Sequence, residues 1–330
     1  MKLNVLDYGL IDKNRTTREA LDETIELAQK AEALGYHRFW VAEHHNIAAF
    51  AISSPELMMM ELGIKTSRIR LGSGGIMALH YSTYKVAEII KTLEARYPNR
   101  IDLGVGNFLG NPLVQSAMKS IHTKNDYPQV IRDLDAYLHH DKENPLPIAV
   151  NPKIDTEPEL WTLSHSEETA QLAAELGLGY VFGIFPYMPL NTIEEAKKVS
   201  AIYHQNFKTS SQGSQPHLTL ASFIVIADTA KEAEAMAKTL DIWMLGNDSF
   251  NEFTQYPDTD DASAYPLTQD QKELIKDNRT RAIIGDKETV KKQLDVLIKA
   301  TQASEVLVIP LVPGLKQRIR SLELMAELYL

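Results

Sequence analysis

The sequence predicts a (β/α)8 barrel, or TIM barrel, with insertions, formed by one domain over residues 1–330. Short apolar runs alternate with amphipathic segments along the chain, and about eight apolar runs can be counted. A strand that is followed each time by a helix indicates parallel strands joined by crossover helices. The length of 330 residues, 44% of them hydrophobic, is ample for one large core.

The first part of the chain follows this alternation regularly. Strands are expected at Leu3–Leu6, Phe39–Ala42, Ile69–Leu71 and Ile101–Leu103. Between them, helices are expected at about 16–35, 54–65 and 83–96. The first helix has apolar residues at helical spacing and ends at Gly35, and the second begins with Ser54 as N-cap and Pro55 at the first position.

The later units are looser but keep the order. Strands are expected at 160–163, 180–185, 217–227 and 305–312, with helices at 166–179, 191–207, 229–245 and 289–300 and a closing helix.

Two insertions interrupt these later strands and helices. Residues 144–158 contain four prolines and predict an irregular surface excursion. Residues 246–268 are polar, acidic and aromatic and predict a long loop, either a lid or binding loop or a solvated excursion.

Composition excludes several classes of function. The 34 basic and 44 acidic residues give a formal charge of −10, which opposes binding to nucleic acid or to anionic membrane surfaces. Without cysteine, disulfides, thiolate nucleophiles and sulfur-rich metal sites are excluded. We find neither the apolar core of a signal peptide at the N-terminus nor eighteen consecutive apolar residues, so a cytoplasmic location is expected by default.

The most conspicuous polar cluster follows the second expected strand, in "RFWVAEHHN" (38–46). Glu43, His44 and His45 would lie at the carboxyl end of a barrel strand, where active sites of such barrels form. Side-chain alternation places Glu43 and His45 on one side and His44 on the other. A metal site is one alternative, although no third ligand is evident, and a purely structural role of the histidines is another.

Several motifs together resemble the bacterial luciferase-like monooxygenase family, in particular its single-chain members. They are "LDYGL", "RFWVAEHHN", "SPEL", "KTSRIRLGSGGIM", "HYSTYKVAE", "TLEARYPNRIDLGVG", "AAELGLG" and "IIGDKETVKKQL", and they are densest from Met1 to Gly106. The resemblance implies a barrel that binds reduced FMN and uses oxygen to oxidise an organic substrate. "AEHHN" followed by "SRIRLGSGG" is the most specific part.

The resemblance also implies roles for single residues. His44 matches the family histidine that assists the oxygen chemistry of the reduced flavin, with Glu43 and His45 beside it. Ser73, Gly74 and Gly75 match the strand end that passes close to the flavin ring, often through a non-proline cis peptide. Glycines allow the backbone to approach a flat ring closely, although a Gly/Ser run can also be a plain turn.

The family resemblance places the phosphate of the flavin in the segment "LSHSEETA" (163–170), in which a helix is expected to begin. His165, Ser166 and Thr169 would then lie at the phosphate. Ser166 also reads as a plain N-cap, and Glu167 and Glu168 would repel a phosphate unless they point away. Relatives commonly carry an arginine where this chain has Asn107, so affinity for an anion should fall. The segment "VFGIFPYM" (181–188) also differs from the family pattern, because close relatives carry histidines there.

Three hypotheses follow. The first is an FMN-dependent monooxygenase that receives reduced flavin from a separate reductase, since the chain has no GxGxxG dinucleotide motif. The second is a flavin-storage protein without catalysis, and the third is a metal-dependent barrel hydrolase that uses Glu43, His44 and His45. Ile184, Phe185 and Met77 favour a small apolar or aromatic substrate. The family resemblance suggests a homodimer formed by the early helices.

Overall fold

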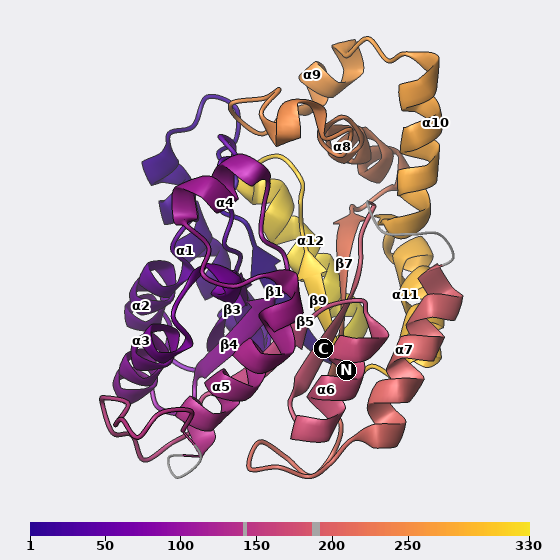
Figure 1. Ribbon diagram of the computed structural model, residues 1–330. Helices are drawn as coiled ribbons and strands as arrows, with labels where there is room; N and C mark the ends of the chain where they lie inside the picture. The colour runs from indigo at the N-terminus through magenta and orange to yellow at the C-terminus, as the bar shows by residue number, and fades with distance from the viewer. Residues whose placement is uncertain (141–143, 187–191) are drawn as a thin grey trace.

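In the computed structural model, which describes residues 1–140, 144–186 and 192–330, parallel strands close into a barrel (Figure 1). Its eight strands are β1 (Lys2–Asp7), β2 (Arg38–Val41), β3 (Arg70–Ile76), β4 (Ile101–Gly106), β5 (Glu159–Leu163), β6 (Gly179–Ile184), β7 (Leu218–Ile226) and β9 (Glu305–Ile309). Strands β1 to β7 pair in chain order, and β9 lies between β7 and β1 and closes the ring. The predicted (β/α)8 barrel is confirmed.

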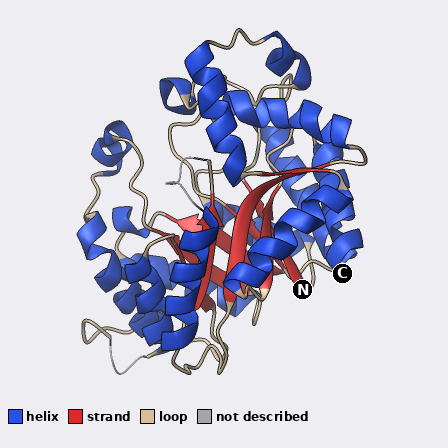
Figure 2. Cartoon of the chain, turned by 90° about the vertical axis from the view of Figure 1, so that its right-hand side faces the viewer, coloured by secondary structure: helices blue, strands red, loops and turns tan. Residues whose placement is uncertain are grey.

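Helices surround this barrel (Figure 2). They are α1 (Thr17–Leu34), α2 (Pro55–Lys65), α3 (Thr83–Arg96), α4 (Pro112–Met118), α5 (Tyr127–His139), α6 (Glu167–Leu176), α7 (Thr192–Asn206), α8 (Ala230–Trp243), α9 (Thr259–Ala264), α10 (Gln269–Asn278), α11 (Lys287–Thr301) and α12 (Leu315–Tyr329). Local sequence sets their ends. For example, Thr16 and Glu19 form a capping box before α1, and Gly35 ends it with a φ of 88°.

Each of the eight expected strands is found, but the helices are more numerous than predicted. The pattern had not indicated α4, α5, α9 or α10, and it missed the strand β8 (Ile283–Gly285), which pairs only with Ile224–Ile226 of β7 among the described residues. Asn111 before Pro112 caps α4 through its side chain, a start signal that was readable in the sequence. Three residues are too few for β8 to show a periodicity.

The two insertions differ from each other. The described backbone of 144–158 contains neither helix nor strand, whereas 246–268 contains a short turn at Asn247–Phe250 and the helix α9. Helices α8, α9 and α10 gather beyond the end of β7 (Figure 1). We propose that residues 1–330 form one domain, because β1 and β9, from opposite ends of the chain, are neighbours in one barrel.

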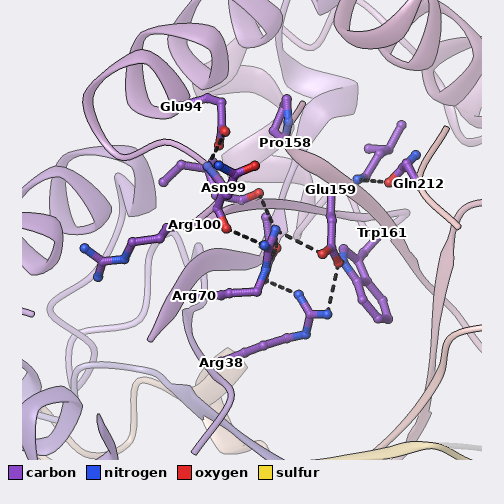
Figure 3. A network of polar contacts seen from close by, with 12 residues as sticks. Arg38, Arg70, Glu94, Asn99, Arg100, Pro158, Glu159, Trp161 and Gln212 are labelled. Carbon is purple, nitrogen blue, oxygen red and sulfur yellow. Dashed lines mark hydrogen bonds and ion pairs between the residues drawn. The ribbon is translucent and has the colours of Figure 1, made fainter. Parts of the chain in front are cut away.

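Charged residues fill the amino-terminal end of the barrel. Arg38 contacts Asp102 at 2.7 Å and Glu305 at 2.9 Å, and Arg70 contacts Asp102 at 2.6 Å. Both arginines also contact Glu159, Arg38 at 3.0 Å and Arg70 at 3.1 Å (Figure 3). Burial opposes the charged carboxylate of Glu305, but the neighbouring Arg38 lowers its pKa to about 2. This end is therefore closed by compensated charges, and the opposite end is left for a site.

Candidate functional site

Glu43 is buried at the carboxyl end of β2, and its carboxylate contacts three neighbouring groups. Its carboxylate accepts hydrogen bonds from the Tyr81 hydroxyl at 2.6 Å and from the Met77 backbone N–H at 2.8 Å, and it pairs with His45 Nε2 at 2.7 Å. Glu43 and His45 therefore lie on the same side, as alternation predicts. Protein groups therefore occupy both oxygens of Glu43, which connects His45 and the chain after β3 to the end of β2.

His44 lies apart from this pair, among aromatic rings. The centroid of its ring is 4.6 Å from that of Tyr8 and 4.9 Å from that of Phe50. Its buried Nδ1 has no hydrogen-bond partner among the described residues. Burial lowers the pKa of His44 to about 4, although the charge of Glu43 acts in the opposite direction. The imidazole is therefore neutral at pH 7, and the His44 side chain as a whole remains partly exposed.

Glycines form the rim of the barrel beside β2. The Gly74–Gly75 peptide is cis, and both residues are partly exposed between buried neighbours. Ser73 does not face outward, because its hydroxyl donates to Gly104 O at 2.9 Å and accepts from Gly104 N at 3.1 Å. A Cβ placed on Gly106 would meet no atom within 4 Å. At Gly106 this rim therefore offers open backbone against which a flat group can lie.

A second set of polar residues joins the ends of β4 and β5. The Asn107 side chain donates to Ser164 Oγ at 3.4 Å, and Ser164 Oγ accepts the Ser166 N–H at 3.0 Å. Ser166 caps α6 by accepting from Thr169 N at 3.2 Å, and its hydroxyl donates to Thr169 Oγ1 at 3.0 Å. Asn107 and the start of α6 are therefore brought together.

Three other predictions concern residues near Asn107 and the start of α6, and their outcomes differ. His165 is exposed, and the hydrogen bonds that join Asn107, Ser164, Ser166 and Thr169 do not include it. Glu167 pairs with Lys198 of α7, so its charge is compensated outside the set. The departure at 181–188 is described only as far as Pro186, because Tyr187 and Met188 lie outside the described residues.

Sequence reasoning missed three contributors. Ser164 follows directly after β5, so the same strand-end rule that found Glu43 could have found it. Tyr81 and the Met77 N–H reach Glu43 from 38 and 34 residues away, a distance over which no local pattern operates.

The geometry gives the metal-site hypothesis no support. His44 lies across the strand from Glu43 and His45, and the described part of the chain contains no group of three His, Asp or Glu side chains placed to share an ion. Glu43 is also occupied by Tyr81 and Met77. In the same residues, no helix is long and apolar enough to cross a membrane.

Comparisons with known proteins agree with this geometry. The family model described as luciferase-like monooxygenase matches residues 1–304. The uncharacterised protein YwcH of Bacillus subtilis is 37% identical over 100% of this chain and 99% of its own length. The N-acetyl-S-alkylcysteine monooxygenase of the same organism is 37% identical over 71% of this chain and 70% of its own.

Solved structures share the fold. Apo-MsnO8 has a TM-score of 0.87 and 31% identity, covering 99% of this chain and 98% of its own. The oxygenating constituent of 3,6-diketocamphane monooxygenase from Pseudomonas putida, solved in complex with FMN, has a TM-score of 0.70 over 99% of this chain and 97% of its own, and at 19% identity it supports the fold alone. From the family match and these relatives, we conclude that the chain belongs to the luciferase-like monooxygenase family.

Proposed function

We propose that the protein is a monooxygenase that binds FMN and uses the reduced flavin and O2 to oxidise a small, apolar organic substrate. The observation that carries this proposal is the partly exposed, neutral imidazole of His44 on the strand end next to the glycine rim. The two are adjacent because Val41 of β2 pairs with Ser73 of β3. Membership of a family described as monooxygenases supports the same reaction class.

The residues present fit a flavin mononucleotide. The open space in front of Gly106 would accept part of the flat ring system, because a Cβ there would meet no atom within 4 Å, and Gly74 and Gly75 would form the neighbouring backbone. Asn107, Ser164 and the N-terminus of the ten-residue helix α6 would hold the phosphate through neutral donors. When bound, reduced flavin would supply the electrons for oxygen activation.

The residues of the chain would then have distinct tasks. His44 would hold or transfer a proton through its partly exposed ring, because a neutral imidazole can both accept and donate. Glu43 would position His45 and the backbone at Met77. Ser73 would contribute by bonding β3 to β4, which fixes the rim, and not by contacting the cofactor with its hydroxyl.

Two protein partners are proposed, a flavin reductase and a second copy of this chain. A separate flavin reductase would supply reduced FMN, since the sequence lacks GxGxxG. We also propose a cytoplasmic homodimer. Leu57 and Ile64, seven residues apart on α2, are 70% and 65% exposed and would be covered by a second copy.

A flavin-storage protein is the second candidate, and Asn107 favours it because an uncharged amide binds a phosphate more weakly than arginine does. Titration with oxidised and with photoreduced FMN, followed by assay of candidate substrates under air, separates the two. Saturable binding with oxidised product supports the monooxygenase. Binding of both flavin forms without any product supports storage, and the absence of binding contradicts both.

A further inference from the structure

A continuous row of aromatic rings extends from His44 across the carboxyl end of the barrel. Consecutive ring centroids lie 5.4 Å apart for Phe185–Phe223, 6.3 Å for Phe223–Tyr8, 4.6 Å for Tyr8–His44, 4.9 Å for His44–Phe50, 5.3 Å for Phe50–Trp243 and 5.9 Å for Trp243–Phe250. We name these seven residues the aromatic row.

The aromatic row has a supporting layer and an accessible layer. Phe223 and Trp243 are buried, at 1% and 3% exposure. The other five, Tyr8, His44, Phe50, Phe185 and Phe250, are partly exposed. Partly exposed rings that stand on buried ones hold their faces in fixed positions while still reaching solvent, which suits contact with a ligand.

Phe250 enters the aromatic row through an uncommon backbone conformation. Gly246, Asp248, Ser249 and Phe250 have φ values of 66°, 46°, 53° and 70°, in the left-handed region that residues other than glycine seldom adopt. Three such non-glycine residues in succession persist only where surrounding contacts impose them, and they concentrate at functional sites. The turn therefore places the Phe250 ring against Trp243 at a conformational cost.

Asn251 fixes this turn onto the chain that follows His44. Its Nδ2 donates to Asn46 O at 2.7 Å, and its Oδ1 accepts from Ala48 N at 2.9 Å. The partly buried Phe250 is thus held by the segment that also carries His44 and Phe50. The insertion 246–268 therefore contributes a ring to the surroundings of His44.

We propose that the aromatic row is a substrate subsite that binds a flat, uncharged ring beside His44, with Phe50 and Phe250 as specificity-determining residues. This inference rests on the proposed function and adds its substrate class. Flat rings gain from offset or edge-to-face contact with other rings, beyond the gain from apolar area. The charge of Glu43 acts at His44 and disfavours an anionic ring there.

The test compares 2-naphthol with decahydro-2-naphthol, which has the same carbon skeleton but is saturated and not flat. Calorimetric titration of the FMN-saturated protein should show 2-naphthol binding about fivefold to tenfold more tightly, since ring pairs contribute this order of affinity. Phe250→Leu, which keeps apolar bulk but removes the ring, should reduce the preference to about twofold. The anion 2-naphthoate should bind more weakly than 2-naphthol.

Phe253→Leu is the matched control. Phe253 lies in the same segment and is partly buried, but its ring contacts Tyr265 at 6.1 Å and no ring of the aromatic row. This variant should keep the wild-type preference. Equal binding of the two naphthols by wild type would overturn the inference. So would an equal loss of the preference for 2-naphthol in Phe250→Leu and Phe253→Leu.

Affinity for FMN is measured separately on each variant. If FMN fails to bind wild type, the proposed function fails. If FMN binds normally while the ring preference is absent, only the subsite fails.

Discussion

The proton transfer proposed for His44 depends on an imidazole that burial keeps neutral. Its pKa of about 4 leaves it uncharged through the physiological range, and its Nδ1 finds no partner among the described residues. His45, only one residue later, is bound to Glu43 instead. Two adjacent histidines therefore have different environments, because successive side chains point to opposite sides of the chain.

Replacing His44 by alanine should leave FMN affinity nearly unchanged. It should slow substrate oxidation by roughly a hundredfold to ten-thousandfold, the range that general acid and base catalysis contributes. FMN fluorescence quenching and product formation measure the two effects. His45→Ala is the comparison, and it should act through folding or binding because it removes a partner of Glu43. Full activity in His44→Ala would remove His44 from the mechanism.

Asn107→Arg should strengthen FMN binding. A charge-assisted contact to phosphate contributes about 1.5 to 3 kcal/mol, or roughly tenfold to a hundredfold in affinity. The dissociation constants of both proteins are measured by flavin fluorescence. An unchanged constant would mean that the phosphate does not lie beside Asn107 and Ser164.

Acidification should destabilise the fold through His44. Its pKa is about 4 in the folded chain and 6.5 in the unfolded chain, so the unfolded chain binds more protons between these values. The full stability is therefore present above pH 6.5 and declines as the pH falls toward 4. His37, whose pKa burial also lowers to about 4, adds to the same effect. Urea unfolding across this range should show a smaller decline for His44→Phe, and an identical decline would contradict the assignment.

Among the elements, the end of β3 sets the shape of the rim. A Cβ on Gly75 would lie 2.8 Å from Gly104 O and 2.9 Å from Gly106 N, which are backbone atoms that cannot rotate away. The family resemblance implied that "GSGG" approaches the flavin ring, and it also placed Ser73 at the cofactor. The structure instead shows the Ser73 hydroxyl committed to β4, which depends on the pairing of strands and could not be predicted from "GSGG" alone.

Two glycine substitutions should separate stability from binding. Gly75→Ala should destabilise the protein by about 1 to 3 kcal/mol, because the added methyl overlaps the backbone of β4. Gly106→Ala should change stability little, since its methyl meets no protein atom within 4 Å, but it should weaken FMN binding by occupying the open rim. Thermal unfolding and FMN titration measure both. Normal FMN affinity in Gly106→Ala would place the flavin elsewhere.

For the whole molecule, strand and helix alternation was sufficient to predict the barrel, because each of the eight strands is an apolar run with its own helix. The position of Glu43 at the barrel mouth followed from the same pattern. The aromatic row could not be predicted, since Phe250 and Phe50 are brought together by the folding of an insertion with no periodicity of its own. Likewise, nothing local indicates that Arg38 meets Glu305 across 267 residues.

The charged cluster at the closed end should dominate stability while leaving the site intact. Arg38→Met should cost roughly 3 to 5 kcal/mol, because it leaves buried carboxylates such as Asp102 and Glu305 without their partner. Arg320→Met is the matched control, and it should cost only about 0 to 1 kcal/mol because the Arg320–Asp228 pair is exposed to solvent. Urea unfolding measures both, and equal costs would show that the buried cluster contributes no more than a surface pair.

The central claim is that this barrel binds reduced FMN and controls its reaction with oxygen. The most direct measurement is rapid mixing of the protein, loaded with photoreduced FMN, with oxygenated buffer while flavin absorbance is followed. Reoxidation in the wild-type protein should differ in rate and spectrum from that of free FMN, and it should change again in His44→Ala. Reoxidation by wild type that is indistinguishable from that of free FMN would contradict this claim.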